Sequence, residues 1–194
     1  MTDVFACARA QIYYNSKRKP LAQVKRETGC SHIINGYLFN GSFQPVGWTV
    51  IDGKVISRDA YQDWGISIGS DGKPHMLTDR GGSFLSGVPL LKNGAKLERS
   101  LTPDVARSAA RTAVGWMPDG RICLWCDKTS LTREQLQNKL LGLGVADALM
   151  LDGGGSTTLV TQTSSGSYQV RNTLASSQRA VGNGIFIARL STPR

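Results

Sequence analysis

Short apolar runs separated by turn dipeptides recur along the chain, and this pattern constrains its fold more than any other feature. Asp52-Gly53 lies between WTVI and KVIS, and Asp119-Gly120 lies between TAVGWM and RICLWC. Asp71-Gly72 and Asn93-Gly94 are two further pairs of the same kind. Such pairs favour the tight turns that join neighbouring antiparallel strands. The sequence therefore predicts an α+β fold whose mixed, mainly antiparallel sheet is built from hairpins.

Helix signals predict about three helices packed on this sheet. One helix follows Pro20 and ends at Gly29, a residue suited to the left-handed turn that closes a helix. A second, short helix follows Thr102, with Pro103 at its first position and Asp104 near the positive end of its dipole.

The clearest helix signal lies in LTREQLQNKLLGLG, residues 131–144. Thr132 can cap its start, and Gln135 completes a capping box. Leucines recur at helical spacing along one face, at Leu136, Leu140 and Leu143. This helix leads through an apolar strand into a glycine-rich turn.

Length and charge limit the class of protein. At 194 residues the chain can fill one core, so we expect a single domain spanning residues 1–194. The formal net charge of +9 predicts attraction to anions, whether nucleic acid, an anionic membrane surface or a small phosphorylated ligand. The densest basic run, SKRKPLAQVKRE, has no interleaved aromatic residues for stacking on bases. We interpret it as a solvated helix face and do not expect nucleic acid as a partner.

The amino-terminal stretch MTDVFACARAQIYYN carries no targeting signal. Asp3 stands where a signal peptide would be basic, and no uninterrupted apolar core precedes Arg9. We therefore expect a cytoplasmic protein without a membrane span. Cys123 and Cys126 form a CLWC motif, but it lies in a predicted strand, where positions three apart face opposite sides of the sheet. A metal knuckle or redox pair is not predicted there.

The stretch LMLDGGGSTTLV, residues 149–160, places three consecutive glycines after an acidic residue at the end of an apolar strand. Consecutive glycines occur where positive φ angles or close backbone approach are required. The backbone N–H groups of such a turn can converge on an oxyanion, and Ser156 and Thr157 add hydroxyls beside them. Asp152 could act as a nucleophile or base. Alternatively, it could only cap the turn by accepting a hydrogen bond from a glycine N–H.

Five blocks in this order resemble the phosphodiester glycosidase family, from about residue 30 to residue 190. The blocks are INGYLFNG, PVGWTVIDGKVIS, ARTAVGWMPDGRICLWCD, LDGGGSTTLV and QRAVGNGIFI. The chain departs from the family at Leu38, where an aromatic residue is common, and at Met150, where many members have asparagine. These two departures predict an altered sugar-facing wall.

The resemblance implies a phosphate-binding site. Arg111 and Arg179 are expected to hold the phosphate, because a planar guanidinium matches two oxygens at once. The glycines of the turn are expected to donate backbone N–H groups, with the hydroxyls of Ser156 and Thr157 beside them. These glycines are Gly153, Gly154 and Gly155.

The resemblance also implies the reacting groups. Asp152 is the candidate to activate water or attack the anomeric carbon, and Asp127 is a candidate second carboxylate or a residue that orients an arginine. Asn35, with Gly36 beside it, and Asn183 are candidates to bind sugar hydroxyls or the phosphate.

The expected function is that of a hydrolase that cleaves a sugar 1-phosphodiester at its anomeric C–O bond. Two alternatives stay open: an enzyme that acts on an intracellular nucleotide or nucleotide-sugar signal, and a non-catalytic module that sequesters a phosphorylated ligand. No cofactor is expected to be required. Mg²⁺ or Ca²⁺ bound by Asp152 stays open, whereas no Asp, Glu and His cluster has the ligand spacing of catalytic zinc. The sequence does not indicate an oligomeric state.

Overall fold

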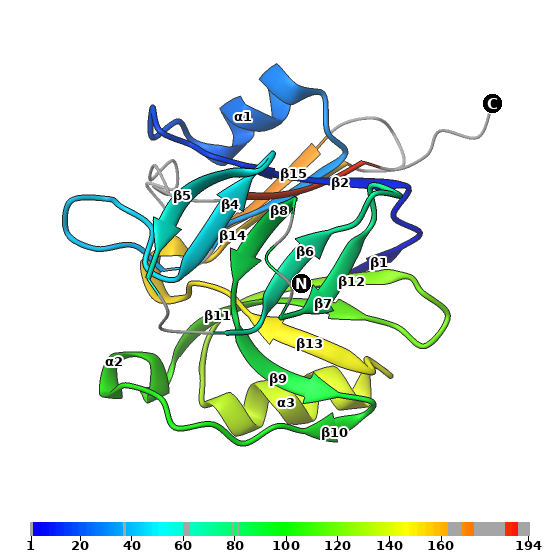
Figure 1. Ribbon diagram of the computed structural model, residues 1–194. Helices are drawn as coiled ribbons and strands as arrows, with labels where there is room; N and C mark the ends of the chain where they lie inside the picture. The colour runs from blue at the N-terminus through cyan, green and yellow to red at the C-terminus, as the bar shows by residue number, and fades with distance from the viewer. Residues whose placement is uncertain are drawn as a thin grey trace.

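Three antiparallel sheets form the framework of the protein (Figure 1), shown in a computed structural model that describes residues 2–36, 38–59, 63–78, 80, 82–162, 168–172 and 185–189. Of residues 168–172 and 185–189, only the backbone is described. The first sheet has six strands in the order β1-β12-β11-β13-β9-β10. These strands are β1 (Thr2–Phe5), β12 (Ile122–Leu131), β11 (Ala109–Trp116), β13 (Asp147–Met150), β9 (Val88–Lys92) and β10 (Ala95–Lys96).

The other two sheets have five strands each. The second has the order β15-β14-β3-β16-β2, and the third has the order β5-β4-β8-β6-β7. The strands of the second are β15 (Tyr168–Asn172), β14 (Thr158–Gln162), β3 (His32–Ile34), β16 (Ile185–Arg189) and β2 (Arg9–Tyr13). Those of the third are β5 (Lys54–Arg58), β4 (Trp48–Ile51), β8 (Ser83–Ser86), β6 (Gly65–Ile68) and β7 (Pro74–Leu77). Strand pairs in the described residues are all antiparallel, which confirms the predicted α+β class.

The four turn dipeptides join consecutive strands, as predicted: β4 to β5, β6 to β7, β9 to β10 and β11 to β12. Asp52 and Asn93 have positive φ angles of 49° and 51°, and the glycines after them have φ angles of 77° and 74°. Two successive positive φ angles are typical of the type I′ turn, whose twist matches that of the flanking strands. Local turn chemistry therefore determines the β4–β5 and β9–β10 hairpins.

The first two helices begin where the sequence predicts. Helix α1 (Leu21–Thr28) follows Pro20 and ends at Gly29, which has a left-handed φ of 65°. Helix α2 (Pro103–Ala106) is a single turn that follows Thr102 and leads directly into β11. The basic run is only partly helical, because Lys17, Arg18 and Lys19 precede α1. The predicted solvated helix face is therefore restricted to the end of the run.

Helix α3 (Arg133–Gly142) confirms the predicted capping box. The backbone N–H of Gln135 donates to the side chain of Thr132, and the Gln135 side chain accepts from the backbone N–H of Thr132. Figure 1 shows α1 against the second sheet at one end of the molecule and α3 against the first sheet at the opposite end.

The buried face of α3 differs from the predicted leucine stripe. Leu136 and Leu140 are fully buried, but Leu143 lies just past the end of the helix and is 41% exposed. Gln137 is instead fully buried. Its Nε2 donates to the backbone oxygen of Leu90 in β9 at 2.9 Å and to that of Leu97, just after β10, at 3.1 Å. The helix is therefore held to the first sheet by a buried amide as well as by leucines.

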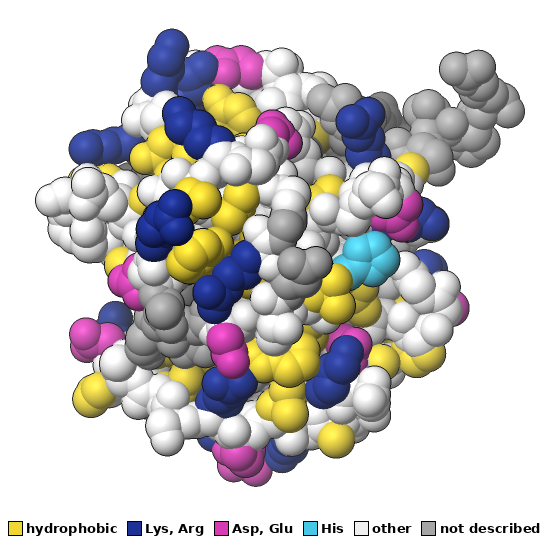
Figure 2. Space-filling model, in the orientation of Figure 1, with side chains coloured by type: hydrophobic (Ala, Val, Ile, Leu, Met, Phe, Trp, Pro, Cys, Tyr) yellow, Lys and Arg dark blue, Asp and Glu magenta, His cyan; other side chains and the backbone are white. Residues whose placement is uncertain are grey.

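On the face shown in Figure 2, the positive charge is dispersed. Figure 2 shows Lys and Arg side chains interspersed with Asp, Glu and hydrophobic groups on the face in view. Several are in exposed ion pairs, such as Lys19 with Glu27 and Arg121 with Asp119. Within the described residues, the helices are too short or too polar to cross a membrane.

Candidate active site

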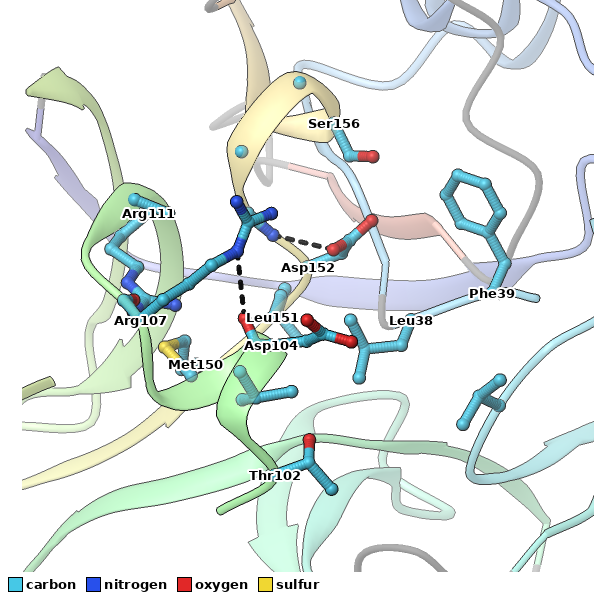
Figure 3. Close-up of a pocket in the computed structure, with 16 residues that line it drawn as sticks. Leu38, Phe39, Thr102, Asp104, Arg107, Arg111, Met150, Leu151, Asp152 and Ser156 are labelled. Carbon is cyan, nitrogen blue, oxygen red and sulfur yellow. Dashed lines mark hydrogen bonds between the residues drawn. The ribbon is translucent and has the colours of Figure 1, made fainter. Parts of the chain in front are cut away.

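A pocket of about 650 Å³ opens where the glycine turn after β13, the α2 turn and the segment after β3 meet. Figure 3 shows Asp152 and Ser156 on one side, Asp104 and Arg107 on the α2 side, and Leu38 and Phe39 across from them. The described lining comprises Leu38, Phe39, Val46, Thr102, Asp104, Val105, Arg107, Ala109, Arg111, and the continuous run from Met150 to Ser156. Both departures from the family pattern, Leu38 and Met150, therefore lie on its wall.

The backbone around Asp152 is fixed to two neighbouring segments. The N–H of Leu151 donates to the backbone oxygen of Thr112 on β11 at 2.9 Å. The N–H of Asp152 donates to the oxygen of Gly36 at 3.0 Å. Asp152 Oδ1 accepts from the N–H of Gly153 at 2.8 Å, so the carboxylate does cap the turn and also lines the pocket. The Gly153 N–H is therefore engaged within the turn, although the sequence predicted it as a donor to phosphate.

Glycine is required at two positions of the turn for different reasons. A Cβ atom on Gly153 would lie 2.4 Å from the backbone oxygen of Ala110 on β11, which is far inside van der Waals contact. Gly154 has a positive φ of 56°, a conformation that side chains disfavour. From Gly154 to Ser156 the chain makes one 3₁₀ turn and then enters β14. The backbone of the turn thus faces the pocket directly.

Asn35 connects three segments beneath the pocket. It is fully buried, and its Nδ2 donates to the backbone oxygen of Asp152 at 2.8 Å. Its Oδ1 accepts from Thr112 Oγ1 and from the N–H of Thr158, both at 2.9 Å. The side chain therefore positions the turn from below, which differs from the predicted contact with substrate. Gly36 likewise contributes its backbone oxygen to the turn.

Arg111 lines the pocket from β11, and its side chain is almost fully buried at 3% exposure. Its Nε donates to the backbone oxygen of Leu131 at 3.1 Å, and its Nη2 donates to the backbone oxygen of Arg107. Among the described residues it has no carboxylate within ion-pair distance. Burial, and then the positive charge of Arg107, lower the pKa of the Arg111 guanidinium. Both effects reflect a cation whose charge is poorly compensated.

Sequence reasoning missed two charged residues of the pocket, Asp104 and Arg107. Arg107 Nε donates to the backbone oxygen of Asp104 at 3.2 Å, and Figure 3 shows its guanidinium pointing towards the glycine turn. The sequence indicates Asp104 only as an acidic residue near the start of a short helix. The signal that could have identified them is the short stretch between Thr102 and Arg111. A helix of one turn is too short to move its residues far from Arg111, so these residues should lie near the same site.

Two of the remaining predicted residues, Asp127 and Thr157, are not part of the described pocket lining. Asp127 is opposite Arg111 in the β11–β12 register, but its Oδ1 accepts from the N–H of Thr129 at 3.0 Å and it does not line the pocket. Burial alone would raise the pKa of Asp127, but the hydrogen bonds from Thr129 outweigh it and lower the pKa. Thr157 is buried behind the turn, whereas Ser156 lines the pocket. Arg179 and Asn183 lie outside the described residues.

The described residues contain no group of three or more His, Cys, Asp and Glu side chains that could hold a metal ion. Among the described lining residues, Asp104 and Asp152 are the carboxylates, and Arg107 and Arg111 are the guanidiniums. The arrangement places acidic groups and cations around one space. Such a site can bind an anion and present a carboxylate to an atom next to it.

Comparison with solved structures shows a shared fold. The zebrafish N-acetylglucosamine-1-phosphodiester alpha-N-acetylglucosaminidase catalytic domain, auto-inhibited by its pro-peptide, matches with a TM-score of 0.69 and 19% identity, covering 99% of this chain and 83% of that chain. A protein from Synechocystis matches with a TM-score of 0.69 and 15% identity, covering 97% of this chain and 57% of that chain. A protein from Burkholderia pseudomallei K96243 matches with a TM-score of 0.64 and 13% identity, over 95% and 72% of the two chains.

Comparison of sequences identifies the family. No curated protein sequence matches the chain. The family model described as phosphodiester glycosidase matches residues 28–188, which include the turn, β11 and the α2 segment. The match covers most of the 194 residues, and its range agrees with the blocks identified from the sequence. The chain therefore belongs to the phosphodiester glycosidase family.

Proposed function

We propose that the protein is a hydrolase that cleaves a sugar 1-phosphodiester at its anomeric C–O bond and releases the sugar and a phosphate monoester. Family membership supports the reaction class. The observation that carries the proposal is the buried Arg111 guanidinium, which lines the same pocket as Asp152. Within the described part of the chain, it donates hydrogen bonds to the backbone oxygens of Leu131 and Arg107 and has no carboxylate at ion-pair distance. A buried cation without a paired charge is unfavourable. A bound phosphodiester supplies the missing negative charge.

The leaving group explains why cations matter more here than in most glycosidases. A glycosidase commonly protonates a poor alkoxide leaving group with a carboxylic acid. The phosphate monoester released from a sugar 1-phosphodiester is already a stable anion at neutral pH. Arg111 from β11 and Arg107 from the α2 turn would stabilise the charge that develops on it, a preorganised electrostatic role worth several kcal/mol (about 3–4 for a single oxyanion donor) in comparable sites.

Asp152 is the residue that we propose to react at the anomeric carbon, either directly or through a water molecule. Its backbone is held by Gly36 and Asn35, and its Oδ1 by the N–H of Gly153 at 2.8 Å. A carboxylate fixed in this way is preorganised for attack, because it loses little conformational entropy when the substrate binds. The same rigidity also fits the activation of a water molecule. In both cases the reacting carboxylate and the phosphate-binding cations must share one pocket.

The experiment is a hydrolysis assay on a panel of sugar 1-phosphodiesters. The panel begins with an N-acetylglucosamine 1-phosphodiester, the substrate class in the name of the similar zebrafish domain, and includes a nucleotide-linked sugar. The wild-type protein should turn over at least one substrate. Asp152→Asn should lower kcat by at least ~100-fold with an unchanged melting temperature, since a positioned carboxylate contributes about this much or more.

The matched control is Asp119→Asn, which neutralises an exposed aspartate in the β11–β12 turn, outside the pocket. It should leave turnover unchanged. Tight binding of every panel member with recovery of intact substrate would contradict catalysis and support a sequestering module. Full activity of Asp152→Asn would show that this carboxylate does not react.

A further inference from the structure

A second carboxylate faces Asp152 across the pocket, from an element that the family blocks of the sequence do not include. Asp104 is the second residue of α2, its side chain is exposed, and it lines the pocket. Figure 3 shows its carboxyl group pointing into the space between α2, Leu38 and Asp152. Asp127, the second carboxylate expected from the sequence, is not part of the lining. The described part of the pocket lining therefore has two carboxylates, contributed by α2 and by the turn after β13.

The main chain of Asp104 is held in place although its side chain is open to solvent. Its backbone oxygen accepts from Arg107 Nε at 3.2 Å, and the backbone oxygen of Arg107 accepts from Arg111 Nη2. Val105, the next residue, is buried and anchors the turn to the core. The buried Arg111 thus fixes the α2 turn through Arg107, and this fixes the position from which the Asp104 carboxylate reaches into the pocket.

The two carboxylates differ in their surroundings, and the difference divides their roles. Asp152 is held by the N–H of Gly153, whereas no ion pair with Asp104 occurs among the described residues. A nucleophile must be fixed beside the carbon that it attacks. A base that deprotonates water must be reachable by solvent after the first product has left. Asp152 meets the first condition and Asp104 meets the second.

We propose that Asp104 is the general base of a two-step hydrolysis in which Asp152 is the nucleophile; the inference rests on the proposed function. In the first step Asp152 forms a bond to the anomeric carbon, and the phosphate monoester leaves with the electron pair of the C–O bond. In the second step a water oxygen attacks the same carbon, Asp104 takes the water proton, and the bond to Asp152 breaks with its electron pair returning to the carboxylate. The anomeric configuration is retained, as in other two-carboxylate double displacements.

The test uses Asp104→Asn on the intact protein, with the panel substrate that the wild type hydrolyses. Because the first step needs no acid, phosphate monoester should be released in a burst of about one equivalent, followed by turnover at least ~100-fold slower than wild type. Intact mass spectrometry should detect protein carrying one covalently attached sugar. Azide, a nucleophile that needs no base, should restore turnover and yield a glycosyl azide. Asp104→Glu should retain more activity than Asp104→Asn.

The matched control is Glu134→Gln, which neutralises an exposed acid in the first turn of α3, away from the pocket. It should leave the burst and the turnover unchanged. Wild-type kcat in Asp104→Asn, or slow turnover without a covalent sugar adduct and without azide rescue, overturns the proposal. If the proposed function itself is wrong, the result is different, because the wild-type protein would then hydrolyse no sugar 1-phosphodiester.

Discussion

At the residue scale, Gly153 decides how closely the turn can approach β11. Substitution by alanine would place a Cβ atom 2.4 Å from the oxygen of Ala110, so the turn or the strand must shift. We expect Gly153→Ala to lower the free energy of unfolding by about 1–3 kcal/mol, the usual cost of overpacking, and to reduce turnover as Asp152 moves. Urea denaturation measures the first effect and the hydrolysis assay the second.

Gly142→Ala is the matched control for this substitution. Gly142 is the last residue of α3 and has no positive φ. A Cβ atom added to it would have no neighbouring atom within 4 Å. Alanine there should be neutral or stabilising by up to about 1 kcal/mol. Equal effects of the two substitutions would argue against a close approach at Gly153.

Asn35 is the residue whose role is most clearly one of positioning. Asn35→Ala removes the acceptor of Thr112 and Thr158 and the donor to Asp152. Each buried polar group left without a partner costs about 1–3 kcal/mol, so the melting temperature should fall and kcat should fall with it. The exposed Asn40→Ala is the comparison, and thermal denaturation followed by assay is the measurement. A large change in KM with normal kcat and stability would instead indicate direct contact with substrate.

The sequence predicts some site residues better than others for a physical reason. Asp152 and Gly153 belong to a local pattern that few other structures tolerate, so the turn could be recognised without a structure. Asp104 and Arg107 are exposed charged residues in a one-turn helix and directly after it, where no packing pattern marks them. The sequence indicates Asn35 as a site residue but not its positioning role, because the partners Thr112, Asp152 and Thr158 lie 77 to 123 residues away in the chain.

At the element scale, the start of α3 depends on local hydrogen bonds. Thr132→Ala removes the side-chain acceptor for the N–H of Gln135 and should lower the free energy of unfolding by about 1 kcal/mol. Gln135→Ala removes only the reciprocal bond to the N–H of Thr132 and should cost less. Urea denaturation of both variants checks the order. A larger loss for Gln135→Ala would contradict this account of the cap.

Hairpins and helices could be predicted because their signals are local, whereas the assembly of the sheets could not. Strand β3 pairs with β14 and β16, and β13 lies between β11 and β9. These partners are distant in sequence, and the apolar runs that form them are interchangeable by composition. The pairing of β13 with β11 nevertheless brings the glycine turn to Arg111, so the site depends on the part of the fold that the sequence does not reveal.

At the scale of the whole molecule, buried thiols make stability depend on alkaline pH. Burial raises the pKa of both Cys7 and Cys123 from 9.0 to about 11. Above pH 9 the unfolded chain therefore loses thiol protons before the folded protein does, and the free energy of unfolding should fall as the pH rises from 9 to about 11. Urea denaturation at several pH values under reducing conditions measures this slope.

Cys123→Ala separates this effect from other groups that titrate in the same range. The variant should lose part of the alkaline slope, because alanine has no thiol proton to bind. The four cysteines are free and buried, so in the native wild type they should also react slowly with a thiol reagent. An unchanged slope in Cys123→Ala would contradict the assignment to its thiol.

At the same scale, the proposed function assigns cleavage of the anomeric C–O bond of a sugar 1-phosphodiester to the pocket between α2 and the β13 turn. The most direct test is hydrolysis in ¹⁸O-labelled water under single-turnover conditions. Both products are then analysed by mass spectrometry. Label is expected in the released sugar and not in the phosphate monoester, and Asp152→Asn should form neither product at an appreciable rate. Label in the phosphate monoester would show attack at phosphorus and contradict the claim.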